Sequence, residues 1–310
     1  MKKLFAALIC GVLILFSGCA KNNEKIAPFD VHPPFYKIEN AETGAVVYML
    51  GSMHVGKPEA VYPREIYAAL DECDTLAVEV DIQALEQDAA ASAEAIAVLQ
   101  CPPGTTVKDY MGEDYNSVIA KFKKKRLYNR AYEGYIPALW SSLWSSQAAE
   151  DCGYDGDFGT DLVMLFYAKS HGKRVEEIET AKEQYQRKAE VSSELQMLML
   201  NDTLALSKDE TKAQFDMLYN AWREGDINAL KALAEEEETN LPEALRDEYE
   251  SYYDAMYTAR QRKMADYIEE KLQGGRKTFV VVGALHYAAP PSIIDNLNAD
   301  EIEVQVISYN

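Results

Sequence analysis

The sequence predicts an α/β fold in which a mixed central sheet is built from both ends of the chain, with a large helical middle. A short, continuous apolar run at residues 46–50 and strongly strand-like segments at 75–80 and 278–282 are typical of strands buried in a sheet. From residue 82 to 272, apolar residues recur at spacings of three and four, which is the helical period. Strands near both chain ends must therefore come together to complete one sheet.

The first predicted elements are a hairpin and a helix. Residues 35–39 and 46–50 are strand-like, and turn residues separate them at 40–44. A helix is expected over 63–72, because proline is favoured in the first helical turn. Since the strand at 75–80 follows, this region has the strand, helix, strand order of a parallel sheet.

The helical middle is interrupted once, and the chain returns to strands at its end. Residues 173–178 follow a helix-ending glycine and are expected to form a strand. Residues 245–272 keep helical spacing across about eight turns and predict one long helix. Residues 302–307 alternate apolar with polar side chains, which is typical of an edge strand.

The N-terminus has the pattern of a targeting segment. Lys2 and Lys3 precede an apolar run of about 13 residues, which is short for a bilayer span and typical of a secretory signal peptide. Small residues directly before Cys19 resemble a bacterial lipobox. Residues 1–18 are therefore expected to be a signal peptide and Cys19 to carry a lipid, such as palmitate; a short membrane anchor is the alternative.

A tether and one folded domain are expected to follow. Charged residues and prolines make 19–34 a lipidated, flexible tether, and 35–310 a single domain. A two-domain alternative would place the boundary near 101–104. The rest of the sequence has no run of about 18 apolar residues. The protein is thus expected in the cell envelope, anchored to a membrane by lipid and facing outside the cytoplasm.

The charge of the chain excludes one class of partner. Its 310 residues include 31 Lys and Arg against 51 Asp and Glu, a formal net charge of −20. So negative a surface repels phosphate backbones, so no nucleic-acid partner is expected. Cations or basic peptides fit such a surface better.

The cysteines leave one question open. Once Cys10 has left with the signal and Cys19 carries lipid, Cys73, Cys101 and Cys152 remain, and an odd number cannot all pair within one chain. In an oxidising compartment Cys101 and Cys152 would be able to form a bridge, with Cys73 buried as a small hydrophobe.

Two short motifs with histidine follow two of the predicted strands. They are GSMH at 51–54 and GALH at 283–286. Ligand and catalytic groups in open α/β sheets gather beyond the carboxyl ends of strands. Both His54 and His286 are at such a place, and the chain has only four histidines.

A third strand ends with two carboxylates, Glu79 and Asp81, which share one face if the strand continues through them. Glu79 is flanked by apolar residues, where an unpaired carboxylate is costly to bury, so it needs a cation. His54, Glu79 and His286 together predict a site for a divalent transition metal with open positions for water.

The competing interpretation is structural. His54 and His286 would be hydrogen-bonded core histidines, and Glu79 would pair with Arg260 or another base. The sequence has no GxSxG elbow, HExxH, Walker loop or GxGxxG after a strand. His171 is at a predicted helix end, where a cation complements the dipole, so we expect it to be structural.

These residues resemble the TraB/GumN family, whose animal relatives are the Tiki membrane-anchored metalloproteases. The resemblance extends from about Tyr36 to Ile307. Its carriers are the two GxxH motifs, Glu79-Val80-Asp81, Gly159-Thr160-Asp161, Glu177-Ile178-Glu179-Thr180 with Gln184 beyond it, and Arg260.

The resemblance implies a mixed α/β fold like that of the erythromycin esterases and the haem-binding ChaN-like lipoproteins, with both histidines and Glu79 in a central cleft. The Tiki branch is linked to metal-dependent peptide cleavage. The leading hypothesis is therefore a metal-dependent hydrolase, peptidase-like, with a peptide or protein substrate. His54, Glu79 and His286 would be its metal ligands and catalytic residues, and the substrate-binding residues would be Arg260, Asp161 and Asp81.

The metal and the activity itself remain open at this point. The resemblance favours manganese or cobalt, and the ligand types are equally compatible with zinc or iron. The alternative function is a non-enzymatic surface lipoprotein that binds haem, a metal or a partner protein through the same histidines.

Overall fold

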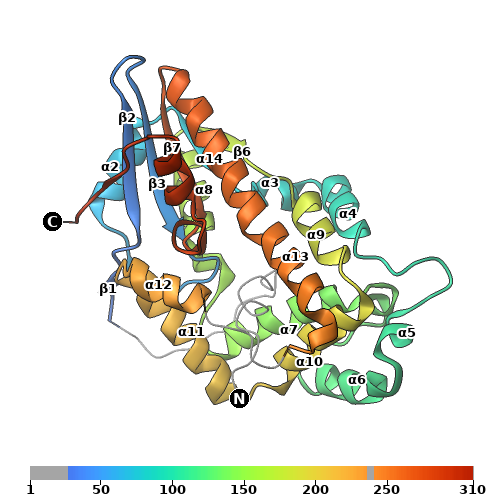
Figure 1. The fold of residues 1–310 in the computed structure, drawn as a ribbon. Coiled ribbons are helices and arrows are strands. Elements are labelled where there is room, and N and C mark those ends of the chain that lie inside the picture. Colours follow the sequence, from blue (N-terminus) through green and yellow to red (C-terminus); the bar gives the residue numbers. More distant parts are fainter. Residues whose placement is uncertain (1–26, 236–240, 310) are drawn as a thin grey trace.

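The computed structural model describes residues 27–235 and 241–309. Its centre is a six-stranded sheet with the strand order β6-β5-β7-β3-β2-β8, and Figure 1 shows the helices around it. The strands are β1 Phe29–Asp30, β2 Phe35–Asn40, β3 Ala45–Ser52, β4 Ala60–Val61, β5 Thr75–Val78, β6 Arg174–Glu177, β7 Lys277–Gly283 and β8 Gln305–Val306. The helices are α2 Arg64–Glu72, α3 Ile82–Gln87, α4 Ala89–Ala97, α5 Val107–Met111, α6 Tyr115–Lys124, α7 Pro137–Asp151, α8 Thr160–Ser170, α9 Ala181–Ala189, α10 Ser193–Ala205, α11 Lys208–Arg223, α12 Ile227–Ala234, α13 Arg246–Met256, α14 Thr258–Gln273, α15 Leu285–Ala288 and α16 Ile293–Ala299.

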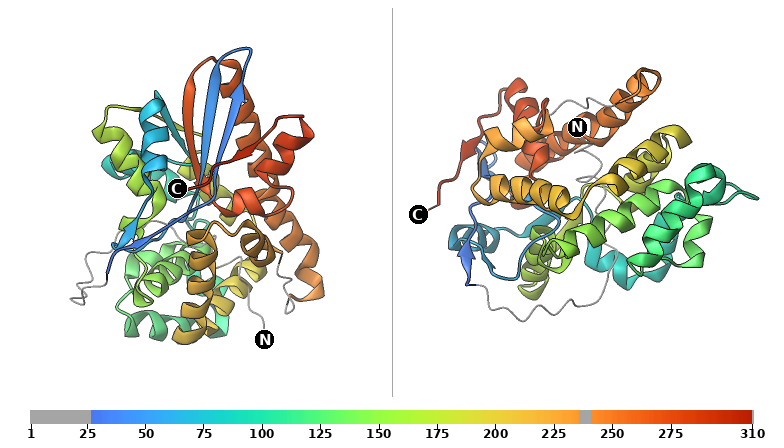
Figure 2. Two further views of the ribbon diagram at one scale, coloured as in Figure 1. Left: turned by 90° about the vertical axis from the view of Figure 1, so that its left-hand side faces the viewer. Right: turned by 90° about the horizontal axis from the view of Figure 1, so that it is seen from below.

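The sheet confirms the predicted fold class. Strands β6, β5, β7 and β3 are parallel, whereas β2 and β8 are antiparallel to their neighbours, so the sheet is mixed. Strand β7, from the end of the chain, lies between β3 and β5 from its beginning. In Figure 2 (left), the orange-red β7 lies beside the blue β3.

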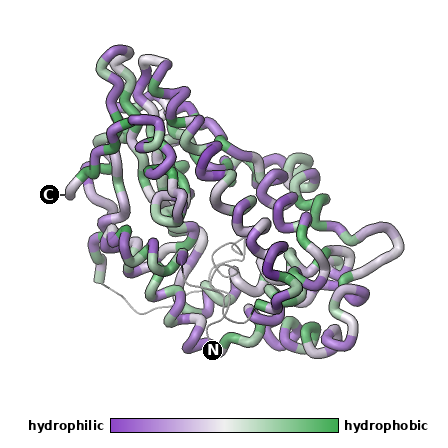
Figure 3. The backbone as a smooth tube through the Cα atoms, in the orientation of Figure 1, coloured by the Kyte–Doolittle hydropathy of each residue, from purple (hydrophilic) through white to green (hydrophobic). Residues whose placement is uncertain are grey.

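Helices cover both faces of the sheet. Side chains alternate along each strand, so Tyr48 and Leu50 point to one face and Val47 and Met49 to the other. On the first face they pack with α2 and α8, and on the second with α14 and α16. Every residue of β3 is buried, as its unbroken apolar run predicts. Much of α14 is hydrophilic in Figure 3, because only one side of it packs on the sheet.

A second apolar cluster fills the helical middle. Trp140 on α7 is fully buried, and its ring meets Phe122 of α6 edge-on at 4.8 Å between centroids. Leu200 and Leu204 of α10 complete this cluster. The sheet and the helical middle thus each have apolar packing of their own, while α11 and α13 contribute to the core on the first face of the sheet.

Two predicted elements differ from the structure. The helix expected over 245–272 is divided into α13 and α14 at Tyr257, whose φ of −123° and ψ of −72° depart from helical values. The apolar spacing continues across the break, so periodicity alone could not reveal it. The edge strand expected over 302–307 pairs only at β8, although it does lie at the edge of the sheet.

The end of the predicted tether packs against the folded body. β1 pairs with β4, and Val31 is fully buried, while His32 is exposed. The predicted signal peptide and the lipid-bearing Cys19 lie outside the described residues. In the part of the chain that is described, no helix is long and apolar enough to cross a membrane.

The three described cysteines are all free thiols. The bridge between Cys101 and Cys152 that the sequence left open does not form. Cys73 is buried at the end of α2, as expected, and burial raises the pKa of its thiol to about 12.

Candidate functional site

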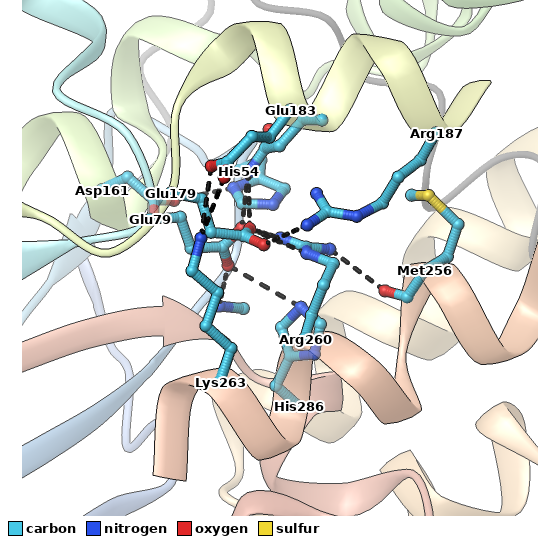
Figure 4. Close-up of polar contacts among 12 residues, drawn as sticks. His54, Glu79, Asp161, Glu179, Glu183, Arg187, Met256, Arg260, Lys263 and His286 are labelled. Carbon is cyan, nitrogen blue, oxygen red and sulfur yellow. Dashed lines mark hydrogen bonds and ion pairs between the residues drawn. The ribbon is translucent and has the colours of Figure 1, made fainter. Parts of the chain in front are cut away.

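Three strand ends converge at the carboxyl edge of the parallel sheet. His54 follows β3 by two residues, Glu79 follows β5 directly, and His286 is in α15 just after β7. Because β3, β7 and β5 are parallel neighbours, their carboxyl ends meet at one place. All three side chains line a cavity of about 170 Å³. Figure 4 shows them together with the charged residues around them.

Glu79 is a buried carboxylate whose two oxygens have different partners. Its Oε1 accepts the backbone N–H of Gly283 at 2.7 Å and lies 3.9 Å from His286 Nε2. Its Oε2 accepts from Arg260 Nη2 at 2.5 Å and from Gln184 Nε2 at 3.1 Å. Burial alone would raise the pKa of Glu79, but the Arg260 guanidinium, the two histidines and the Gly283 N–H hold it well below its usual range.

Glu179 extends the charged cluster. It follows β6, and its N–H donates to the Glu79 carbonyl at 2.9 Å, which sets the two carboxylates side by side. Arg260 Nε donates to Glu179 Oε2 at 2.8 Å, and Arg187 Nη2 lies 3.0 Å from Glu179 Oε1. Each buried carboxylate is therefore compensated by a guanidinium, which is the condition for burying charge at tolerable cost.

His54 is held by Asp161, the second residue of α8. His54 Nδ1 and Asp161 Oδ2 are 2.9 Å apart. Burial disfavours the charged imidazole, but the neighbouring carboxylate outweighs it and raises the pKa of His54 to about 9. The ring's Nε2 is on the Glu79 side, because a Cβ added to Gly283 would lie 3.8 Å from that nitrogen and 3.4 Å from Glu79 Oε1.

Two glycines allow the His54 loop to approach the loop before α8. A Cβ on Gly159 would come within 2.4 Å of the His54 carbonyl oxygen, and one on Gly56 within 2.0 Å of the Phe158 carbonyl oxygen. Thr160 N–H donates to the Met53 carbonyl at 2.8 Å, which fixes the same contact. The close approach places His54 against Asp161.

His286 is the most enclosed of the three groups. It is 5 % exposed, and its Nδ1 has no hydrogen-bond partner among the described residues. Burial and the nearby Arg260 lower its pKa to about 3, so the ring is neutral. The loop after it is anchored by Gln261 Nε2, which donates to the Ala289 carbonyl at 3.0 Å.

Of the residues assigned from sequence, the structure brings together all but Asp81. His54, Glu79, His286, Arg260 and Asp161 line the cavity. Strand β5 ends at Val78, and the chain turns into α3, where the Asp81 carboxylate accepts the Ala84 N–H at 3.0 Å and Lys169 Nζ at 2.7 Å. Asp81 is therefore a helix N-cap, outside the residues that line the cavity.

Glu179 and Gln184 are among the residues that carry the family resemblance, but the sequence assigned no role to them or to Arg187. The carboxylate at the end of the strand predicted over 173–178 was a usable signal for Glu179, since the same rule identified Glu79. Gln184 and Arg187 follow on α9 and face the cluster only because β6 pairs with β5. His171, by contrast, is exposed at the end of α8 and stacks on Tyr167, as expected of a structural residue.

The donor set can be tested against a divalent metal. Two imidazoles and one carboxylate oxygen suit a transition metal with open positions. The 3.9 Å between Glu79 Oε1 and His286 Nε2 is long for a hydrogen bond but within two metal–ligand bonds of about 2.0–2.2 Å each. The carboxylate on His54 Nδ1 is a usual orienting partner for a metal-binding histidine. Among the described residues, however, no three His, Cys, Asp or Glu side chains are close enough together to form a ready-made metal site. The donor types therefore fit a divalent transition metal, and the three side chains are not yet at the spacing of a formed coordination group.

Comparison with known families matches residues 34–306 to the model of the TraB/PrgY/gumN family. The match includes both GxxH motifs and all the residues that line the cavity. No curated protein and no solved structure matches the chain.

Proposed function

The chain belongs to the TraB/PrgY/gumN family, and from that premise we propose that it is a metal-dependent hydrolase acting on a peptide or similar acyl bond outside the cytoplasm. The observation that carries the proposal is the meeting of His54, Glu79 and His286 at three neighbouring strand ends, in one cavity. Manganese or cobalt is our first choice of metal, and Cys19 the site of the lipid anchor.

The metal would be held by His54 Nε2, His286 and Glu79 Oε1. Bound there, a divalent ion polarises a carbonyl and lowers the pKa of bound water. Asp161 holds the His54 ring through Nδ1, which fixes its orientation and leaves Nε2 for the cavity. The neutral state of His286 keeps a ring nitrogen free to donate its lone pair.

Glu79 stays ionised because Arg260 and Gln184 donate to its Oε2. Its Oε1 is then the oxygen that serves as ligand or accepts a proton from the attacking water. Arg260 lines the same cavity and carries a positive charge beside the reacting groups, so it is placed to hold negative charge that develops on a substrate oxygen.

The test uses the intact, purified protein. Metal content is measured first, and then turnover on a panel of peptides and esters with and without a chelator. We expect about one metal per chain and turnover that the chelator abolishes. His54→Ala and His286→Ala are each expected to lose both, and the double variant to be little worse, because residues that act as a unit are not additive.

His171→Ala is the control, since His171 is exposed and is not among the residues that line the cavity. Full metal content in His54→Ala would refute the shared site. Bound metal without turnover on any substrate would instead favour the non-enzymatic binding protein.

A further inference from the structure

The cavity at the three strand ends has a second, apolar wall that the proposed reaction does not use. One face of α11 supplies Phe215, Leu218 and Trp222, which recur at helical spacing. Leu230 of α12, Met256 of α13 and Leu285 of α15 complete the wall. All six side chains are at least nine-tenths buried.

This wall is adjacent to His54, Glu79 and His286. Leu285 is the neighbour of His286 in sequence, and the Met256 carbonyl accepts from Arg260 Nη1 at 3.2 Å. Trp222 Nε1 donates to the Gly51 carbonyl at 2.8 Å, so the indole is fixed against the end of β3. An apolar group in this part of the cavity would therefore lie next to His54, Glu79 and His286.

A polar group on α11 faces the same cavity. Gln214 lines it, and its Oε1 is buried and accepts no hydrogen bond from the described residues. A buried carbonyl oxygen without a donor is costly, unless a ligand supplies one. The N–H of a peptide is such a donor.

Resting on the proposed hydrolase function, we propose that this wall is a specificity pocket for one aromatic or branched aliphatic side chain of a peptide substrate, and that Gln214 Oε1 accepts an N–H of that peptide. The size of the cavity agrees with a single large side chain. The whole cavity, with the three strand-end residues included, has a volume of about 170 Å³, and roughly 150 Å³ is enough for an apolar cavity to hold benzene, so the part beside this wall has room for at most one large side chain. The six wall residues carry no charge, so a charged side chain that lies against them would be desolvated without a partner on this wall; the charged residues of the cavity, Arg260 and Lys188 among them, are outside it.

The first measurement compares peptides that differ at one residue. With Phe, Leu, Ala or Asp at that position, kcat/KM is expected to be at least about 100-fold higher for Phe and Leu than for Ala or Asp. Equal values across the series would overturn the pocket while leaving the hydrolase intact.

The second measurement is binding without turnover. N-acetyl-phenylalaninamide and N-acetyl-aspartamide are titrated into the His286→Ala protein and followed by calorimetry. We expect only the phenylalanine amide to bind. Binding of that amide with no hydrolytic activity in the wild type would refute the proposed reaction and keep the pocket, so the two failures are distinguishable.

Variants on α11 locate the pocket. Leu218→Trp would fill the pocket with its larger side chain and is expected to abolish binding of the phenylalanine amide. Met217→Trp, at the adjacent exposed position, is expected to leave that binding unchanged. If Leu218→Trp is poorly folded by thermal melting, Leu218→Ala takes its place, and its preference is expected to move from phenylalanine toward a naphthylalanine probe. Unchanged selectivity in Leu218→Ala would overturn the assignment.

Gln214→Leu tests the hydrogen bond separately. This substitution is expected to weaken the binding of N-acetyl-phenylalaninamide by about fivefold. Full N-methylation of both amide nitrogens removes every N–H of the probe, and this methylated probe is expected to bind wild type and Gln214→Leu equally. An equal loss for both probes would assign Gln214 to packing alone and overturn that part of the proposal.

Discussion

Replacing Arg260 with methionine should destabilise the protein strongly. Glu79 would then keep its burial and lose its guanidinium, since within the described residues no other Lys or Arg lies within 4.0 Å of it. Glu179 would keep Arg187 at 3.0 Å. Removing one partner of a buried ion pair costs about 3–5 kcal/mol, because the other charge is left without compensation.

The assay is urea unfolding of the metal-free protein, with chelator present so that a bound metal contributes nothing. Since the entropy of unfolding is about 2.1 cal/mol/K per residue, a loss of 3–5 kcal/mol corresponds to a fall in Tm of roughly 5–8 °C for a chain of this size. The matched control is Arg262→Met, two residues along α14, where the guanidinium is 44 % exposed and forms surface ion pairs. It should lose less than about 1 kcal/mol.

The sign of the pH dependence follows from the pKa of Glu79. In the wild type this pKa is lowered, so the ion pair stabilises the protein above the ordinary glutamate pKa of about 4.3 and fades as the pH falls. In Arg260→Met the largest charge that lowers this pKa is gone while burial still raises it, so the Glu79 carboxylate contributes less stability as the pH rises. The gap between the two proteins should thus be widest near neutrality and narrowest in acid.

A second substitution tests whether the loss of stability comes from the Glu79 carboxylate. Glu79→Gln together with Arg260→Met should be more stable than Arg260→Met alone, since the carboxylate that lost its guanidinium is gone and Glu179 keeps Arg187. The reasoning fails if Arg260→Met loses no more than Arg262→Met, or if its deficit is the same at pH 4 and pH 7.

Two further predictions concern the His54 loop. Gly159→Ala should cost about 1–3 kcal/mol, because the new methyl group would lie 2.4 Å from the His54 carbonyl oxygen, whereas Gly156→Ala, which meets open space, should be neutral; thermal melts of both would decide this. In metal-free protein the raised pKa of His54 gives stability that is full below about pH 6.5 and is lost as the pH rises through about 9. Asp161→Asn should remove that loss, and an identical pH profile in unfolding experiments would show that the carboxylate does not charge the ring.

The sequence located the central strands well because their apolar runs have a direct physical cause. A strand covered on both faces by helices must be apolar throughout, and the ends of β3 and β7 lie within two residues of the predicted ends. The pattern carries no information on strand order. That β7 lies between β3 and β5 depends on long-range pairing, and this order is what brings the two GxxH motifs to the same cavity.

The residues placed differently have equally specific reasons. Glu79 and Asp81 would share a face only if a strand continued through both, but β5 ends one residue before Glu79, so Asp81 caps α3 instead. The apolar residues of α13 and α14 keep the same helical spacing across the break at Tyr257, so the periodicity of the sequence does not reveal that break. Arg187 and Gln184 acquire their contacts from the pairing of β5 with β6, which local sequence does not express.

The two interpretations of Glu79 that the sequence set against each other are compatible in the structure, because they use different oxygens. The ion pair with Arg260 forms at Oε2, where Gln184 also donates. Oε1 faces His286 Nε2 and has one N–H donor, that of Gly283, so it retains a lone pair for a metal or a proton. The guanidinium on Oε2 lowers the negative charge that Oε1 would offer to a cation, and it also keeps the carboxylate ionised in a buried place. Arg260 should therefore weaken metal affinity at neutral pH and preserve metal binding in acid, so metal titrations of the wild type and of Arg260→Met at neutral pH and in acid separate these two effects: the variant should bind metal more tightly at neutral pH and less tightly in acid.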